Sequence, residues 1–491
     1  MKSKRILTAL LVLLMLTSCA KTTDTGNAET GETPTQNTET TAVPEETEYR
    51  YYEHLPEKDL GGRDYRIISR KTDVGHDPTK YTDFGNDEID AVELTGAPIN
   101  DVVYNRNREL ESRYNFRFVS IQNDLTPAKT VKTSVMAGSD DYDTVVDGLN
   151  RMSDFTMFYN LDSLSSIDLT ADCWDQNANT SLSVGGKRYI AVGDMLTLDK
   201  KGTVAILFNK PIATDLHLES LYDVVREGRW TLDTFEEMLR LASTDLNGNG
   251  QMDRDDQWGF CCEDFDFGAL MFSTGNRFSE KDENDYPTLT MYTDQSVDCY
   301  DRIYNIMNDA SVTMNMDTGY GAEVFMKTFT EDRGLFIMLG ICTAIEFRYM
   351  ESDFGILPLP KKDEAQKEYL TTIFTSNSGS VAIPLSSGAP EDNAFLLQAI
   401  CLASTNTLKP VFYDQVLNGI VTRDEESSEM LDILFAGRVF DLTFINDWGG
   451  SIYFYSSNMK AGKNLSSSYA AQEKKILNDM NSAIQAYKEL E

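Results

Sequence analysis

A twelve-residue segment from position 245 to position 256 carries the most specific chemical pattern in the sequence. Oxygen-bearing side chains stand at its positions 1, 3, 5, 9 and 12, and a glycine stands at position 6, as a seven-coordinate calcium ion requires of one loop. The residue at position 7 would contribute its backbone carbonyl. The spacing therefore predicts a calcium site formed by Asp245, Asn247, Asn249, Gln251, Asp253 and Asp256.

The last position of this loop departs from the usual pattern. Asp256 replaces the customary bidentate glutamate. Because its side chain is one methylene shorter, we expect weak binding, in the range of roughly 0.1 to 1 mM found for extracellular modules. Residues 257–260 have the pattern of a strand start, so the predicted ion is structural and the loop is not half of a paired sensor. The alternative is a polar turn rich in Asp, Asn and Gly.

The sequence offers few residues for histidine-based catalysis. The sequence holds 3 histidines, and no G-x-S-x-G or H-E-x-x-H spacing surrounds them. With 79 Asp and Glu residues, some carboxylate pair is always available for glycoside hydrolysis, so their abundance is no evidence of catalysis. A glycine-rich phosphate-binding motif is also absent from the sequence. We therefore predict no catalytic residues and no enzyme activity.

The formal net charge of -35 argues against nucleic acid and anionic membrane surfaces as partners, because both require clustered Lys and Arg. Six cysteines besides Cys19 show no metal-type C-x-x-C spacing. An even number permits disulfides outside the cell, but several of these cysteines lie in apolar stretches, where buried free thiols are expected.

The first residues have the three regions of a signal peptide: positive charges, the apolar run 6–16, and small polar residues before Cys19. Eleven apolar residues rise roughly 16 Å as a helix, about half of the hydrocarbon core, so the run is too short to span a membrane. Residues 16–19 resemble the bacterial lipobox, which implies that residues 1–18 are removed and Cys19 is acylated. An ordinary signal peptide with a chance cysteine is the alternative. Residues 19–60 are predicted to be an acidic, disordered tether with a reach of roughly 35 Å.

The remaining body begins with an alternation of strands and helices. Strand patterns cover 64–69, 116–121 and 142–147, and helical patterns cover 98–114 and 127–136. This order predicts a parallel sheet with helices on its faces. Ligands collect at the carboxyl ends of such strands, which points to Arg70 and to the segment from Asp147 to Asn150. Surface salt bridges are the alternative role of Arg70 and Asp147.

Later strands are predicted at 204–208, 334–339, 354–359 and 369–383, and the last third of the chain is predicted to be helical. Several segments, in this order along the chain, resemble the extracellular solute-binding proteins of bacterial ABC importers, of the carbohydrate type (family 1). These segments are residues 61–69, 96–107, 141–147, 208–210, 229–235 and 353–361.

The resemblance implies an α/β fold with a two-lobed clamshell of the periplasmic-binding-protein type, with discontinuous lobes joined by hinge strands. Lobe one would comprise 61–200 and 330–370, and lobe two 201–329 and 371–491. The crossings would lie near 207–210 and 375–383. The implied protein is a monomeric, lipid-anchored receptor on the outer face of a single-membrane bacterium.

The implied partners of this receptor are a carbohydrate, expected to be an oligosaccharide, and the membrane subunits of an ABC permease. The membrane itself would be contacted through the acyl anchor only. A surface glycosidase or lyase, and a glycan-adhering lipoprotein without a transport role, are the alternative functions.

Sugars bind such clefts by stacking on aromatic rings and by hydrogen bonds to amides, carboxylates and Arg. The candidate contacts are therefore Arg70, Asp147, Asn150, Trp174, Tyr320 and Trp448. A buried core position is the alternative for each aromatic residue. The sequence Gly340-Ile-Cys342 stands where the family often carries a bulky aromatic, which leaves the usual stacking contact without a residue.

Overall fold

The structure is a computed structural model, and it describes residues 55–70, 88–123, 126–344, 347, 349–376, 378–414 and 424–490. The predicted signal peptide, Cys19 and nearly all of the predicted tether lie outside the described residues. The chain divides into two units, Met1–Glu48 and Tyr49–Glu491, and the description below concerns the second. Among the described residues, no helix has both the length and the apolar character needed to cross a membrane.

The first sheet contains β1 (Arg63–Arg70), β2 (Phe116–Asn123), β3 (Thr144–Gly148) and β11 (Gly379–Ala382) in the order β11-β3-β1-β2. Strand β1 pairs in parallel with both β2 and β3, whereas β11 is antiparallel to β3. The connecting helices are α1 (Pro98–Tyr114) and α2 (Pro127–Ala137), each with a proline in its first turn. The predicted parallel β-α-β-α-β unit is confirmed.

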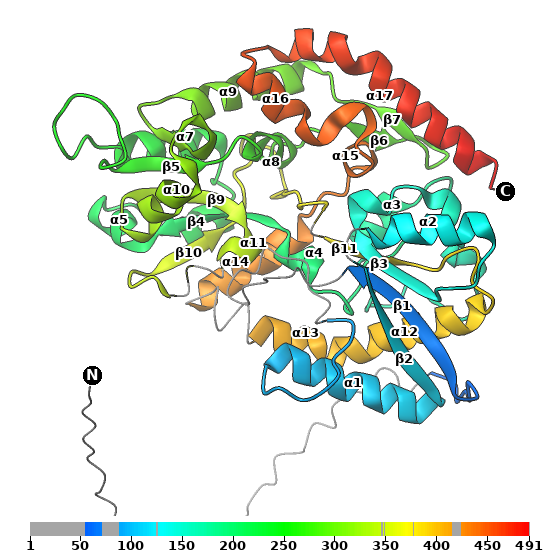
Figure 1. Cartoon of the computed structure of the whole chain (residues 1–491). Helices are drawn as coiled ribbons and strands as arrows, with labels where there is room; N and C mark the ends of the chain where they lie inside the picture. The colour runs from blue at the N-terminus through cyan, green and yellow to red at the C-terminus, as the bar shows by residue number, and fades with distance from the viewer. Residues whose placement is uncertain are drawn as a thin grey trace, which may run out of the picture. The chain divides into compact units, whose positions relative to one another are not determined.

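The second sheet contains β4 (Val204–Asn209), β5 (Trp258–Cys262), β8 (Thr313–Asn315), β9 (Gly334–Gly340) and β10 (Phe354–Leu357) in the order β10-β4-β9-β5-β8. These strands are buried along their whole length, which explains their continuous apolar sequences. Strand β9 runs antiparallel to β4 and parallel to β5, so the sheet is mixed. Figure 1 shows the two sheets as separate groups of strands within the second unit.

Helices cover both sheets. They are α3 (Gln176–Leu182), α4 (Leu198–Lys201), α5 (Lys210–Asp215), α6 (Leu221–Arg226), α7 (Leu232–Ala242), α8 (Asp266–Ser273), α9 (Asp294–Asn308), α10 (Gly321–Thr330), α11 (Ile341–Ala344), α12 (Pro390–Asn406), α13 (Leu408–Val411), α14 (Glu425–Ala436), α15 (Leu442–Ile445), α16 (Phe454–Lys460) and α17 (Leu465–Lys488). A hairpin of β6 (Ser279–Lys281) and β7 (Pro287–Leu289) and several 3-10 turns, among them η2 (Leu149–Arg151), η5 (Met316–Thr318) and η8 (Trp448–Tyr453), complete the body. The predicted helical last third is confirmed.

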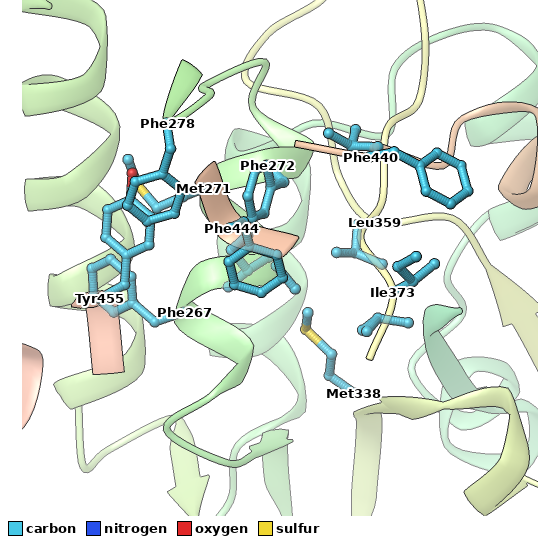
Figure 2. Close-up of a cluster of buried hydrophobic side chains, with 14 of the residues drawn as sticks. Phe267, Met271, Phe272, Phe278, Met338, Leu359, Ile373, Phe440, Phe444 and Tyr455 are labelled. Carbon is cyan, nitrogen blue, oxygen red and sulfur yellow. The ribbon is translucent and has the colours of Figure 1, made fainter. Parts of the chain in front are cut away.

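Aromatic side chains of the C-terminal helices pack against α8 and Phe278, beside the second sheet. Phe444 of α15 lies 5.1 Å from Phe272 of α8 and 6.2 Å from Phe278, measured between ring centroids. Figure 2 shows this group, with Met338 of β9 and Ile373 close by. The six cysteines from Cys173 to Cys401 are all free and buried, as expected for thiols in apolar stretches.

The predicted division of the body into lobes is wrong for three strands. Strands β9 and β10, at 334–357, pair with β4 in the second sheet and not with the first sheet. Strand β11 pairs with β3 in the first sheet, although 371–491 was assigned to lobe two. The reason is physical: an apolar strand sequence predicts burial but does not specify the strand with which it exchanges backbone hydrogen bonds.

The chain passes between the two sheets along two segments that are hydrogen-bonded to each other. Thr203 and Ile373 form an antiparallel bridge, Val204 N donates to Thr372 O (3.1 Å), and Phe374 N donates to Gly202 O (2.8 Å). The first crossing thus precedes β4, earlier than the predicted 207–210, whereas the second lies just before β11, near the predicted 375–383. We refer to residues 202–204 and 372–376 as the hinge segments.

A buried ionic group lies beside the first hinge segment. The guanidinium of Arg438 is 2.6 Å from the carboxylate of Asp199 in α4, and it also pairs with Asp175, which caps α3. Burial alone would raise the pKa of Asp199, but Lys200 and Arg438 hold it below its usual value. This group therefore links two helices to the segment that precedes α15.

Candidate ligand-binding site

A cavity of about 380 Å³ lies where three strands of the second sheet end at the hinge. Its wall includes residues at or just after the ends of β5, β8 and β9, one residue of α10 and two of the second hinge segment: Glu263, Met316, Gly340, Phe325, Phe374 and Ser376. Carboxyl ends of strands at a change of sheet are where α/β proteins bind ligands. The volume and the mainly apolar wall with a few polar groups also suit a ligand site, for which about 300 to 1,000 Å³ is usual.

The aromatic ring of this wall comes from the hinge. Phe374 is half-buried, lines the cavity and lies 5.5 Å from Phe265 between ring centroids. A Cβ atom placed on Gly340 would be 2.5 Å from the Phe374 ring, closer than any real Cβ contact. The missing aromatic at 340–342 is therefore explained, because the ring of Phe374 occupies the space that a side chain at Gly340 would need.

Four acidic residues gather at the edge of the cavity, and we call Glu263, Asp264, Asp266 and Asp317 the acidic cluster. Hydrogen bonds from backbone amides link its members: Glu263 N donates to Asp266 Oδ2 (2.9 Å), and Asp264 N donates to Asp317 Oδ2 (2.9 Å). Its cationic neighbour is Lys460, whose Nζ is 2.6 Å from Asp264 and 4.0 Å from Asp317. Of the four, Glu263 lines the cavity.

Burial and mutual repulsion raise the pKa values of two carboxyl groups in this cluster. Burial, and then the charge of Asp317, raise the pKa of Glu263, while Lys460 opposes the shift. Burial, and then the charge of Glu263, raise the pKa of Asp266 well above its usual value. Asp266 is fully buried, and its Oδ1 has no hydrogen-bond partner among the described residues. The cluster therefore carries less negative charge than four free carboxylates would.

Asp147, predicted as a ligand contact, has a structural role instead. Its side chain is fully buried, and its two oxygens accept hydrogen bonds from Ala128 N (3.2 Å) and Gly148 N (2.8 Å). Burial raises the pKa of its carboxyl group, although these donors and Arg151 oppose the shift. Asp147 therefore fixes the first turn of α2 against the end of β3.

Asn150 does lie at the hinge, as expected for a residue after β3. Its backbone N donates to Thr375 O (3.3 Å), while its Oδ1 is buried without a hydrogen-bond partner among the described residues. The neighbouring Arg151 donates from Nη1 to Ser376 O (3.1 Å), so this turn contacts a residue that also lines the cavity. Arg70 stands half-buried at the end of β1, in register with Asn123 of β2.

The three predicted aromatic contacts are not brought together. Trp174 is 2% exposed and its Nε1 donates to Gln398 Oε1 (3.0 Å), so it is a core residue. Trp448 is also buried, in η8. Tyr320 is half-buried and packs on Trp258, 5.9 Å away between ring centroids. Sequence reasoning missed Phe374 and Glu263: Phe374 lies within the predicted strand 369–383, and the one signal for Glu263 was its place after the strand start at 257–260.

The predicted calcium loop is an ordered turn in the structure. Asp245 accepts hydrogen bonds from Gly248 N and Gly250 N, both 2.7 Å, and the buried Asp256 accepts from Leu246 N (2.9 Å) and Asp253 N (2.7 Å). Oxygen atoms of Asp and Asn thus face the inside of one loop, which is the donor chemistry that calcium requires. Among the described residues, however, no three His, Cys, Asp or Glu side chains converge as metal ligands. The calcium site in this loop therefore remains a prediction.

Comparison with known proteins gives a match only at the level of structure. No family model and no curated protein sequence matches the chain. Among solved structures, UspC from Mycobacterium tuberculosis is 12% identical with a TM-score of 0.56, and covers 85% of this chain and 100% of its own. The maltose/maltodextrin-binding domain MalE from Bdellovibrio bacteriovorus, bound to maltotriose, is 14% identical with a TM-score of 0.52, and covers 86% and 100%.

A third solved structure is an ABC substrate-binding protein from Listeria monocytogenes in complex with cycloalternan, 13% identical with a TM-score of 0.52, which covers 87% of this chain and 99% of its own. At such identities the match concerns the fold. Two sheets joined by paired hinge segments, with a cavity at the hinge, agree with it. The body of this chain therefore has the periplasmic-binding-protein-like α/β fold of ABC substrate-binding proteins.

Proposed function

We propose that this protein is a lipid-anchored, extracytoplasmic receptor that captures a carbohydrate, expected to be an oligosaccharide, and delivers it to an ABC permease. The observation that carries the proposal is the cavity at the hinge, where Phe374 offers a ring and Glu263 a carboxylate. A sugar presents an apolar face and hydroxyl groups to such a pair. Solved proteins of the same fold are bound to maltotriose and to cycloalternan.

The position of the cavity supports a receptor that closes on its ligand. The wall combines strand ends of the second sheet with the hinge, and the turn after β3 in the first sheet contacts the same hinge residue, Ser376. A ligand that contacts both sides would stabilise the closed arrangement by its additional interactions there. Delivery to a permease then requires that the receptor stay near the membrane, which acylation of Cys19 and the tether would provide.

The test is ligand-dependent stabilisation of the full chain against a panel of glycans, followed by product analysis. A ligand at one hundred times its dissociation constant adds about 2.7 kcal/mol to the free energy of unfolding. We expect a raised melting temperature with no new product, and F374L should reduce the stabilisation. F435L is the matched control, because Phe435 does not line the cavity. Turnover of a glycan would refute the receptor function in favour of a glycosidase or lyase.

We also propose that the loop 245–256 binds a structural calcium ion through its Asp and Asn oxygens and the backbone carbonyl of Gln251. The support is the ligand spacing and the inward-facing oxygens of Asp245 and Asp256. The ion would neutralise the carboxylates of the loop and hold it against the start of β5.

A further inference from the structure

We propose that the saccharide bound in the hinge cavity carries a protonated amino group, and that this group lies next to Glu263. This inference rests on the proposed function, because it names the chemical class of the ligand for the same cavity. A saccharide that contains unacetylated hexosamine units is the ligand that fits. The proposal follows from the distribution of charge, from missing hydrogen bonds in the acidic cluster and from the composition of the wall.

The first observation is an excess of negative charge at one side of the cavity. Glu263 is part of the wall, and Asp264, Asp266 and Asp317 lie directly behind it in the same cluster. Lys460 compensates Asp264, at 2.6 Å, and its side chain is 57% exposed. In the described part of the chain Glu263 and Asp266 form no ion pair, although the charge of Lys460 acts on Glu263 from a greater distance.

The second observation is that hydrogen bonds are missing in this cluster. The half-buried Glu263 stands at the cavity wall, and the fully buried Asp266 behind it accepts a hydrogen bond from Glu263 N at Oδ2 but none from any described residue at Oδ1. No described residue donates a hydrogen bond to the Glu263 carboxylate. Buried polar groups without partners are rare in proteins and indicate an unfilled interaction. A donor that arrives with the ligand would satisfy Glu263.

The third observation concerns the rest of the wall. Phe325 and Phe374 present aromatic rings, Met316 and Met338 present polarizable thioethers, and none of the described lining residues is Lys, Arg or His. The hydroxyl groups of a neutral sugar can donate hydrogen bonds to Glu263 but leave its charge uncompensated, and burial of an uncompensated charge is unfavourable. An ammonium group offsets that charge and also interacts favourably with aromatic faces.

The pH dependence of binding follows from the groups that face Glu263. These are Asp264, Asp266 and Asp317 of the cluster, Lys460 of α16 and the buried thiol of Cys262, and the acidic neighbours together with burial raise the pKa of Glu263 and of Asp266. A cationic ligand stabilises the ionised carboxylates, so it binds best when they are deprotonated. Affinity for the amino sugar should therefore rise with pH, by as much as about tenfold per unit for each proton released.

The experiment compares three oligosaccharides of equal length on the full chain by calorimetry: a glucosamine oligomer, its N-acetylated form and a maltose oligomer. We expect the glucosamine oligomer to bind at least about tenfold more tightly than the N-acetylated form, and its affinity to rise from about pH 4.5 to about pH 6, a range in which most of its amines are protonated. E263Q should remove this preference. E237Q is the matched control, because Glu237 is exposed on α7, away from the cavity.

The outcomes separate the two proposals. If the neutral oligomers bind as tightly as the amine, or if E263Q keeps the preference with an unchanged melting temperature, the inference is overturned and the receptor function stands. The pH series on the unmodified chain tests the inference even if E263Q fails to fold. If none of the three oligomers and no glycan of the wider panel binds, the carbohydrate function and this inference fail together.

Discussion

The close approach of Gly340 and Phe374 makes a quantitative prediction for G340A. The added Cβ would lie 2.5 Å from one ring carbon of Phe374 and 3.0 Å from another, whereas ordinary contacts begin near 3.4 Å. The ring must therefore move by about 1 Å, and overpacking of this kind costs about 1 to 3 kcal/mol. Because the same ring lines the cavity, we also expect ligand affinity to fall by about tenfold or more.

A double-mutant cycle isolates this contact. We would measure the free energy of unfolding by urea denaturation for the unmodified chain, G340A, F374A and the combined variant. In the F374A background the ring is gone and the tightest remaining contact of the added Cβ is Cys342 Sγ at 3.2 Å, so the alanine at position 340 should cost much less and the coupling energy should be about 1 to 3 kcal/mol. G379A is the control, because a Cβ there would lie at an ordinary 3.4 Å from Leu196. A coupling energy below about 0.5 kcal/mol would refute the steric argument.

Three further predictions concern buried charge and the loop 245–256. R438M should cost about 3 to 5 kcal/mol in denaturant unfolding, because it leaves Asp199 buried without its closest cation, whereas R226M, which breaks ion pairs at the surface, should change stability little. D266N should raise the melting temperature near neutral pH, since the raised pKa means that stability is lost as pH rises through it; the gain should vanish below about pH 4, where the aspartic acid is neutral in both states. A chelator should lower the melting temperature of the full chain but not that of D245A, and an unchanged melting temperature of the full chain would refute the calcium proposal.

The sequence was sufficient for the local elements of the first sheet but not for the pairing of later strands. Residues 63–148 alternate between period two and period 3.6, and β1 pairs in parallel with the two strands that follow it, as this alternation predicts. Strand β9 has the predicted apolar pattern, yet it pairs with β4 and β5 and not with the first sheet. The choice of partner depends on the whole core, which no local pattern contains.

The same reason explains the mixed result for the site. Asp147 stands at a strand end, as a ligand contact would, but a carboxylate that fixes a helix start has the same local sequence. Trp174 lies in a polar stretch that resembles a loop, but it is part of the core beside α12, where the distant Gln398 accepts the hydrogen bond of its Nε1. Glu263 and Phe374 line the same cavity because the second hinge segment returns to the ends of β5 and β9.

The ring of Phe374 is attached to a hinge segment, and this has a kinetic consequence. The backbone N of Phe374 donates to Gly202 O in the other hinge segment, so bending the hinge displaces the ring that forms part of the cavity wall. A ligand stacked on that ring cannot leave independently of the hinge. Under the proposed receptor function, its residence time would then be governed by the frequency of hinge opening, and a permease that promotes opening would at the same time accelerate release.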